Sequence, residues 1–156
     1  MDLFSILLFL HVLGAIVAFG PSFAAPIAGS MAAKEPQHAN FVARLNGLTA
    51  KAIITPVSLT LAVTGTGMIL VRGWDTITAD RRWLEVALVL YVVALVFAVA
   101  YQSRNGRRMV ELTAQPPTGG GPSPELRQTA TRLRYGGYFL AAMVTVITFL
   151  MVTKPF

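Results

Sequence analysis

The chain has no cysteine among its 156 residues. Disulfides, iron–sulfur clusters, thiol catalysis and cysteine-based metal sites are therefore excluded, because each of them requires a thiol. Charge is also scarce, since Asp, Glu, Lys and Arg make up 13% of the residues, against about 25% in a typical soluble domain. Histidine occurs only twice, as His11 and His38. These shortages argue against ion-coupled carriers and pumps, which need several ionisable groups within the membrane.

Apolar residues are abundant instead. They make up 54% of the chain, and the mean hydropathy is +0.62, which is more than a small soluble core can bury. The length corresponds to one domain over residues 1–156. The net charge of +6 would suggest nucleic acid in a soluble protein, but membrane proteins gather basic residues in cytoplasmic loops. We therefore expect a lipid bilayer as the partner, and no nucleic acid.

Four apolar runs are long enough to cross a bilayer, since a helix rises ~1.5 Å per residue and needs about 20 residues. They lie at about residues 3–25, 52–71, 84–103 and 135–153. The sequence predicts an all-α, four-helix membrane bundle with both termini on the same side. A small-residue pattern near Ala25 resembles a signal-peptide cleavage site, but the basic n-region is missing, so we expect the first helix to be retained.

Proline and glycine predict where the first two helices begin and end. We expect the first helix to kink or end near Pro21 and Pro26, and to close at Gly29-Ser30. Pro36 suits a first helical turn, so the second helix should begin there and project from the membrane. Pro56 should then bend it inside the membrane.

The last two helices also extend beyond the membrane. Helix 3 is expected to begin near Glu85 and to continue as a basic extension, RNGRRMVELTAQ. The stretch 114–123 is rich in Gly and Pro and predicts a mobile loop. Ser123-Pro124-Glu125 combines a helix cap, a first-turn proline and a first-turn acid, which should start helix 4 well before the bilayer.

The distribution of Lys and Arg predicts the orientation. Connections 1 and 3 with their flanks hold nine basic residues and the opposite side holds four, which indicates cytoplasmic connections and an N-out, C-out topology. The nine are Lys34, Arg44, Lys51, Arg104, Arg107, Arg108, Arg127, Arg132 and Arg134, and the four are Arg72, Arg81, Arg82 and Lys154. Six of the nine could contact anionic lipid headgroups, although orientation alone accounts for them: Arg104, Arg107, Arg108, Arg127, Arg132 and Arg134. Trp74 and Trp83 should mark the opposite membrane face.

Hydroxyl and small residues cluster in the second span. Such residues let membrane helices approach closely and hydrogen-bond to one another, so we expect this face to pack against protein. They are Thr55, Ser58, Thr60, Thr64, Gly65, Thr66 and Gly67.

His11 is the only ionisable group inside the first span. An intramembrane imidazole should be neutral, face the bundle interior and mark a candidate site. Gly14 lies on the same helical face and would leave a smooth groove in which a flat macrocycle fits. Haem iron accepts a histidine as axial ligand, so binding of haem b at His11 is one interpretation.

The depth of each side chain in the membrane limits which residues could lie opposite His11 or hydrogen-bond to its ring. Met143 lies at a depth similar to that of His11, roughly 12–15 Å at ~1.5 Å per residue, and is the candidate second ligand. Thr64, Tyr91 and Thr145 lie at the same level. Any of these three could instead hydrogen-bond the imidazole and serve only to hold helices together.

Three segments, LHVLGAIVAFG, LVLYVVALVF and FLMVTKPF, resemble the predicted integral membrane proteins of domain-of-unknown-function family 2269, which are bacterial. This resemblance implies four transmembrane helices, a bacterial inner-membrane location and no assigned activity. The pattern of His11 and Gly14 is also similar to the first helix of copper-resistance D-type proteins and of HemJ-type haem enzymes. That similarity implies an axial-ligand role for His11. The HemJ-type enzymes add an intramembrane lysine, which the third span here lacks.

Two functions therefore remain open. One is haem-b binding for electron transfer, haem handling or a redox step, with His11, Gly14 and Met143 at the site. The other is an accessory or structural subunit of a membrane complex, or a homo-oligomer, with no cofactor of its own. Whether the chain is an enzyme stays open.

Overall fold

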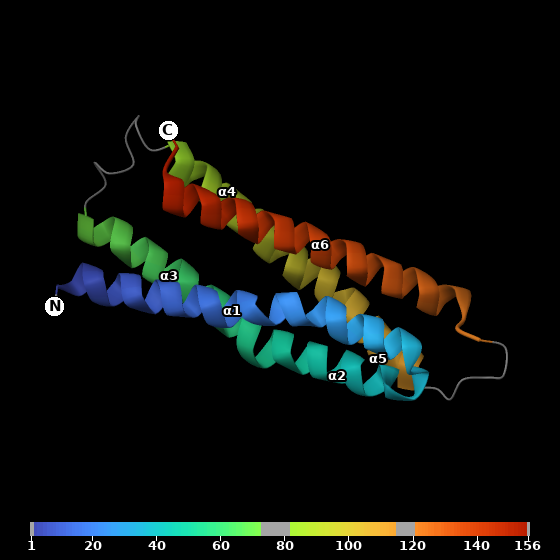
Figure 1. The fold of residues 1–156 in the computed structure, drawn as a ribbon. Coiled ribbons are helices and arrows are strands. Elements are labelled where there is room, and N and C mark those ends of the chain that lie inside the picture. Colours follow the sequence, from blue (N-terminus) through green and yellow to red (C-terminus); the bar gives the residue numbers. More distant parts are fainter. Residues whose placement is uncertain (1, 73–81, 115–120, 156) are drawn as a thin grey trace.

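The computed structural model describes residues 2–72, 82–114 and 121–155, and these residues form helices and no strand. Four helical rods run back and forth along the length of the molecule (Figure 1). They are α1 (Leu3–Lys34), a second rod over Pro36–Arg72, a third over Arg82–Ala114, and α6 (Pro124–Thr153). Each is long and apolar enough to span a membrane, so the predicted all-α architecture with four spans is confirmed.

The first rod is longer than the sequence predicts. α1 passes through Pro21 and Pro26 and also through Gly29-Ser30, where we expected it to close. The hydroxyl of Ser30 bonds back to the carbonyl of Ile27, and the good helix formers that follow extend the last turns. The helix ends at Glu35, because the residue before a proline is disfavoured in the α conformation and Pro36 comes next.

The second rod begins at Pro36, as expected. It consists of the short 3₁₀ helix η1 (Pro36–His38), α2 (Ala39–Thr49), the π-helical turn η2 (Ala50–Ile54) and α3 (Thr55–Arg72). Pro56 explains the wide turn, because its ring displaces the carbonyl four residues earlier. The N–H of Thr55 bonds to the carbonyl of Ala50, five residues back, and the helix continues with a bend.

The third rod consists of α4 (Arg82–Phe97), a second π-helical turn η4 (Ala98–Gln102) and α5 (Ser103–Ala114). The predicted start of α6 is confirmed, since the Ser123 hydroxyl accepts a hydrogen bond from the N–H of Leu126 and Pro124 is the first helical residue. Most of the predicted mobile loop, residues 115–120, lies outside the described residues, as does Trp74.

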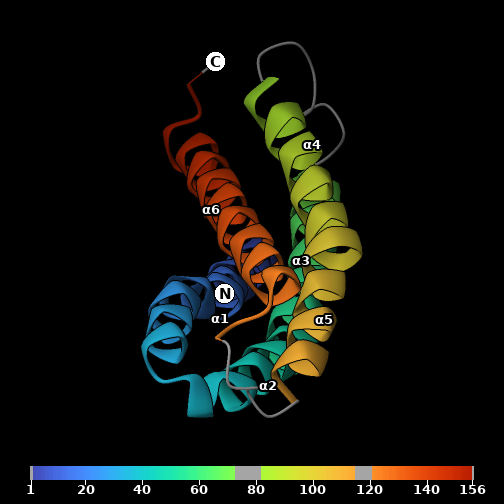
Figure 2. The ribbon, with the colours of Figure 1, turned by 90° about the vertical axis from the view of Figure 1, so that its right-hand side faces the viewer.

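Two antiparallel pairs make up the bundle. α3 lies along α1, and α6 lies along α4; the pairs diverge toward the end that holds both termini (Figure 1). Seen from the side, α6 lies between α1 and the α4–α5 rod (Figure 2). Both termini at one end is the arrangement that four crossings require. Which face of the membrane this end occupies stays a prediction.

Polar contacts join α2, α5 and α6 at the other end. The side-chain amide of Asn40 on α2 donates to the carbonyl of Val110 and to the hydroxyl of Thr113 on α5. Arg108 on α5 binds Glu111 at 2.9 Å and Glu125 on α6 at 2.6 Å. These two carboxylates raise the pKa of Arg108, which stays protonated throughout the physiological range. α2, α5 and the start of α6 are thus held together.

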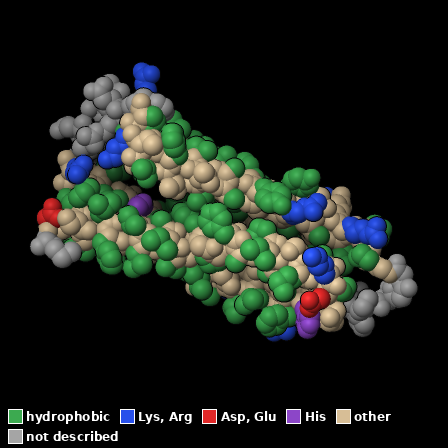
Figure 3. All heavy atoms as spheres, in the orientation of Figure 1, with side chains coloured by type: hydrophobic (Ala, Val, Ile, Leu, Met, Phe, Trp, Pro, Cys, Tyr) green, Lys and Arg blue, Asp and Glu red, His purple; other side chains and the backbone are tan. Residues whose placement is uncertain are grey.

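The surface is largely apolar. The buried hydrophobic residues are few and mostly small (Ala18, Leu61, Ala87, Ala94 and Leu150), whereas large hydrophobic side chains are exposed on every long helix. Figure 3 shows hydrophobic side chains along the visible face, with charged side chains gathered toward its two ends. A bilayer covers such a surface, because its apolar interior replaces the water that these side chains avoid.

Candidate functional site

The candidate site lies in the contact between α1 and α3, where each helix supplies small residues to receive large ones. Leu61 of α3 fills the space beside Gly14, and a Cβ on Gly14 would lie 2.9 Å from Leu61 Cδ2. His11 packs against Gly65, and Leu7 packs against Gly67, each at 3.3 Å from where a Cβ would be. These three glycines let the helix backbones approach closely, as small residues do in membrane bundles.

His11 is fixed by Thr64 at the centre of this contact. Nδ1 of His11 lies 2.9 Å from the hydroxyl oxygen of Thr64. The same hydroxyl also lies 2.9 Å from the backbone carbonyl of Thr60 and 3.2 Å from that of Leu61, both on its own helix. When that hydroxyl donates to one of these carbonyls, as helical threonines commonly do, its oxygen accepts from Nδ1–H of His11 and the lone pair of a neutral ring lies on Nε2.

Nε2 of His11 stays open. It has no hydrogen-bond partner among the described residues, and the only buried side-chain nitrogen or oxygen without a partner there is Oε1 of Gln102. His11 as a whole is partly buried. The site thus presents an imidazole whose ring is held by Thr64 and whose Nε2 has no partner among the described residues.

The neighbours of His11 differ in part from the prediction. Of the three residues predicted to hold the ring, Thr64 does so. The Tyr91 hydroxyl instead donates to the carbonyl of Ser58, and the Thr145 hydroxyl donates to Ala141 of its own helix. The open groove predicted beside Gly14 is taken up by Leu61, because Gly14 serves the α1–α3 contact.

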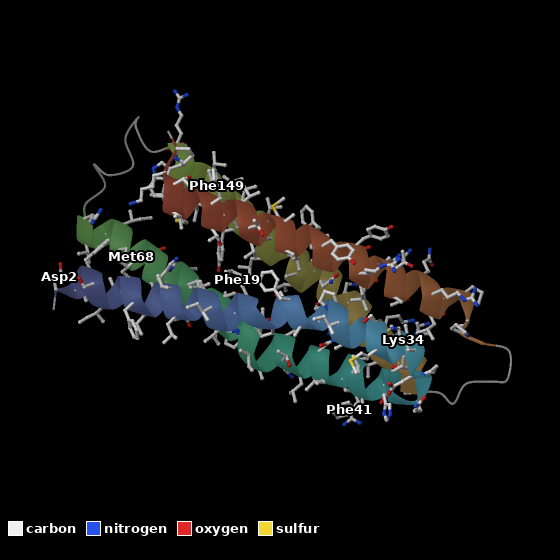
Figure 4. The ribbon with its side chains drawn as sticks, viewed as in Figure 1. Asp2, Phe19, Lys34, Phe41, Met68 and Phe149 are labelled. Carbon is white, nitrogen blue, oxygen red and sulfur yellow. The ribbon has the colours of Figure 1, made fainter. Side chains whose placement is uncertain are left out.

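Met143 lies on α6 and is partly buried, in the helix pair opposite His11. Its neighbours Leu140, Val144 and Ile147 line a cavity of about 70 Å³ between the pairs. Phe19 of α1 points toward this space (Figure 4). Ligand pockets for drug-sized molecules are roughly 300–1,000 Å³, so this cavity is too small for a macrocycle.

The described residues also contain no group of three or more His, Asp or Glu side chains that could hold a bare metal ion. An iron atom at His11 would therefore have to bring its other ligands with it, as the four nitrogens of a porphyrin do.

Sequence reasoning missed a second polar contact inside the bundle. The side-chain amide of Gln102, in η4, donates to the carbonyl of Leu133 at 2.9 Å, and its Oε1 faces Gly136 of α6. A Cβ at Gly136 would lie 2.3 Å from that oxygen. Gly136 and Gly137 mark a close approach in the sequence, but nothing there indicates the π-helical turn that aims Gln102 at them.

Comparison with known proteins identifies the family. Residues 5–155 match the family described as predicted integral membrane protein (DUF2269). The chain belongs to this family. No curated protein and no solved structure matches it. Family membership confirms an integral membrane protein and assigns it no activity.

Proposed function

We propose that this DUF2269 protein binds haem b in the membrane, where Nε2 of His11 would hold the iron. The observation that carries the proposal is the contact of 2.9 Å between Nδ1 of His11 and the Thr64 hydroxyl, because with the proton on Nδ1 the lone pair on Nε2 is left to bind iron. Histidines that bind metals commonly donate their other ring N–H to a second group, which fixes the tautomer and the ring orientation.

Five residues have assigned roles in this proposal. His11 supplies the iron ligand, Thr64 orients its ring, and Gly65 provides the flat surface against which the ring packs. Met143 is the second residue that would hold the iron in this proposal, although the cavity beside it is too small for a macrocycle, and Gly14 contributes through the packing of α1 on α3. Bound haem would supply a one-electron iron couple, which suits electron transfer, haem handling or a redox step in the bacterial inner membrane.

A second candidate is an accessory or structural subunit of a membrane complex, or of a homo-oligomer, with no cofactor. It is favoured by the fact that the Thr64 hydrogen bond and the Leu61 packing account for His11 and Gly14 without any ligand. In that case the imidazole only holds α1 against α3.

Titration of the detergent-purified protein with haemin separates the two candidates. We expect the wild type and His38→Ala to bind with a Soret band at the same position, since His38 is exposed and pairs with Glu35. We expect His11→Ala to lose specific binding. Thr64→Val keeps the ligand but removes its orientation, so it should bind more weakly, by roughly 10- to 100-fold. Equal binding by His11→Ala and His38→Ala would contradict the proposal, as would a helical wild-type protein that binds no haemin.

A further inference from the structure

A groove on the outer side of the third rod and α6 is separate from the His11 site. Its volume is about 380 Å³. Aromatic rings from both elements form its walls, and Thr131 and Arg132 lie at one end. The lining residues are Phe97, Tyr101, Thr131, Arg132, Tyr135, Gly136 and Phe139.

The groove has a fixed shape. Phe97 packs against Tyr101 and Phe139, with ring centroids 4.9 and 4.7 Å apart. The π-helical turn η4 and Gly136 bring the two helices together here, and the Gln102 amide bonds across the contact to the carbonyl of Leu133. The groove is therefore built by the backbone geometry of two elements and does not depend on one mobile side chain.

One end of the groove lies within the apolar spans, and the other end lies outside them. Phe97 and Phe139 lie within the apolar spans, whereas Thr131 and Arg132 precede the apolar part of α6. Seven residues separate Arg132 from Phe139, which is about 10 Å along a helix at ~1.5 Å per residue. An occupant would therefore have an apolar portion beside the rings and a polar portion beside the arginine.

The charged residues around the groove indicate the charge of the polar portion of its occupant. Among the described residues at this end of the molecule, the acids are Glu35, Glu111 and Glu125, and all three are paired: Glu35 with His38, the other two with Arg108. Arg132 has no carboxylate within 4.0 Å in the described part of the chain. Four other arginines also lack a carboxylate within 4.0 Å among the described residues: Arg104, Arg107, Arg127 and Arg134. The region therefore carries uncompensated positive charge that favours an anion. Figure 3 shows Lys and Arg side chains toward this end of α6.

We propose that this groove is a binding site for one anionic phospholipid of the surrounding bilayer. The phosphate lies beside Arg132 and Thr131, and the upper part of an acyl chain lies between the aromatic rings. A free phosphate would leave the apolar walls unused, and a zwitterionic lipid would carry its own cation to the arginine.

Native mass spectrometry of the full-length protein in detergent tests this proposal, with added dioleoylphosphatidylglycerol or dioleoylphosphatidylcholine. We expect one phosphatidylglycerol to bind about fivefold more tightly than phosphatidylcholine. Arg132→Gln should remove this preference, and Arg132→Lys should retain most of it. The matched control Arg127→Gln, on the same helix but outside the groove, should leave it unchanged. Phe97→Ala should weaken both lipids.

Several results would overturn the proposal. Equal binding of the two lipids would show that the charge of the headgroup does not matter for binding. Equal losses from Arg127→Gln and Arg132→Gln would indicate only general surface attraction. Competition by millimolar inorganic phosphate would indicate a phosphate site, and a dimer that dissociates with Phe97→Ala would indicate a second copy of the chain in the groove. Circular dichroism of each variant separates these results from unfolding.

Discussion

At the scale of single residues, the interior of this bundle depends on a few close contacts between small and large side chains. The sequence predicts that His11 faces the interior and that Thr64 is one of its candidate partners, because both follow from helical spacing and depth. It does not predict that Gly14 receives Leu61, since an apolar helix offers several faces of similar character and only the partner's register selects one.

Removing the acceptor of His11 should destabilise the α1–α3 contact. Thr64→Val preserves the side-chain shape and deletes the hydroxyl, so we expect a loss of about 0.6–2 kcal/mol in the free energy of unfolding. Thr66→Val is the matched control, because Thr66 is on the same helix and exposed. Thermal unfolding in detergent measures both variants, and equal melting temperatures would contradict the role assigned to Thr64.

A larger residue at Gly136 should displace the side chain of Gln102. In Gly136→Ala the new Cβ would lie 2.3 Å from Oε1 of Gln102, so the helices must separate or the Gln102 bond must break. We expect a loss of roughly 1–3 kcal/mol, typical of an overpacked contact. Gly137→Ala is the control, since its nearest contact is 4.0 Å away. If the double variant Gly136→Ala with Gln102→Ala is no more stable than Gly136→Ala alone, this explanation is wrong.

At the scale of helices, the sequence predicts a capped helix start better than it predicts π-helical turns or the effect of proline and glycine within a helix. Ser123-Pro124-Glu125 carries its own start signal, and the structure confirms it. The end of α1 was predicted too early, because glycine and proline weaken a helix without ending it when neighbouring helices support the backbone. The π-helical turn η4 contains no proline or glycine that would predict it, and η2 could be linked to Pro56 only once the turn was seen.

The first helix should have a pH-dependent start. Hydrogen bonds from the side chain of Ser5 and from its backbone N–H to the Asp2 carboxylate lower the pKa of Asp2 below its ordinary value of 3.8. A lowered pKa means that the charged cap stabilises the helix above that ordinary value and loses its effect as the pH falls through the lowered pKa. The amide shift of Ser5, followed by NMR from about pH 5 to pH 2, should report this loss. Asp2→Asn should abolish the titration, and a Ser5 shift that titrates unchanged in that variant would contradict the assignment.

At the scale of the whole molecule, the number of spans followed from length and hydropathy alone, and the structure agrees. The arrangement into two pairs did not follow, because four apolar rods can associate in several ways. This arrangement depends on specific contacts between helices. The Tyr91 hydroxyl bonds to the carbonyl of Ser58, and Arg108 binds its carboxylates at the end of the molecule away from the termini. For the candidate haem site, the sequence predicts the interior imidazole of His11 but not the packing of Leu61 against Gly14 beside it.

The predicted topology can be checked by cysteine labelling, because the chain has no cysteine of its own. Leu3 lies near the N-terminus and Phe41 lies on α2 (Figure 4), with exposed fractions of 59% and 66%. A membrane-impermeant maleimide should label Leu3→Cys in intact cells and should label Phe41→Cys only after permeabilisation. The reverse pattern would show that the nine-to-four excess of basic residues does not set the orientation.

The most direct measurement for the account as a whole is the absorption spectrum of the wild-type protein purified from haem-replete cells, with haem quantified per chain. Nε2 of His11, which has no partner among the described residues, predicts a Soret band and about one haem per chain. A well-folded, helical preparation that contains no haem would contradict the proposed function and leave His11 as a structural contact between α1 and α3.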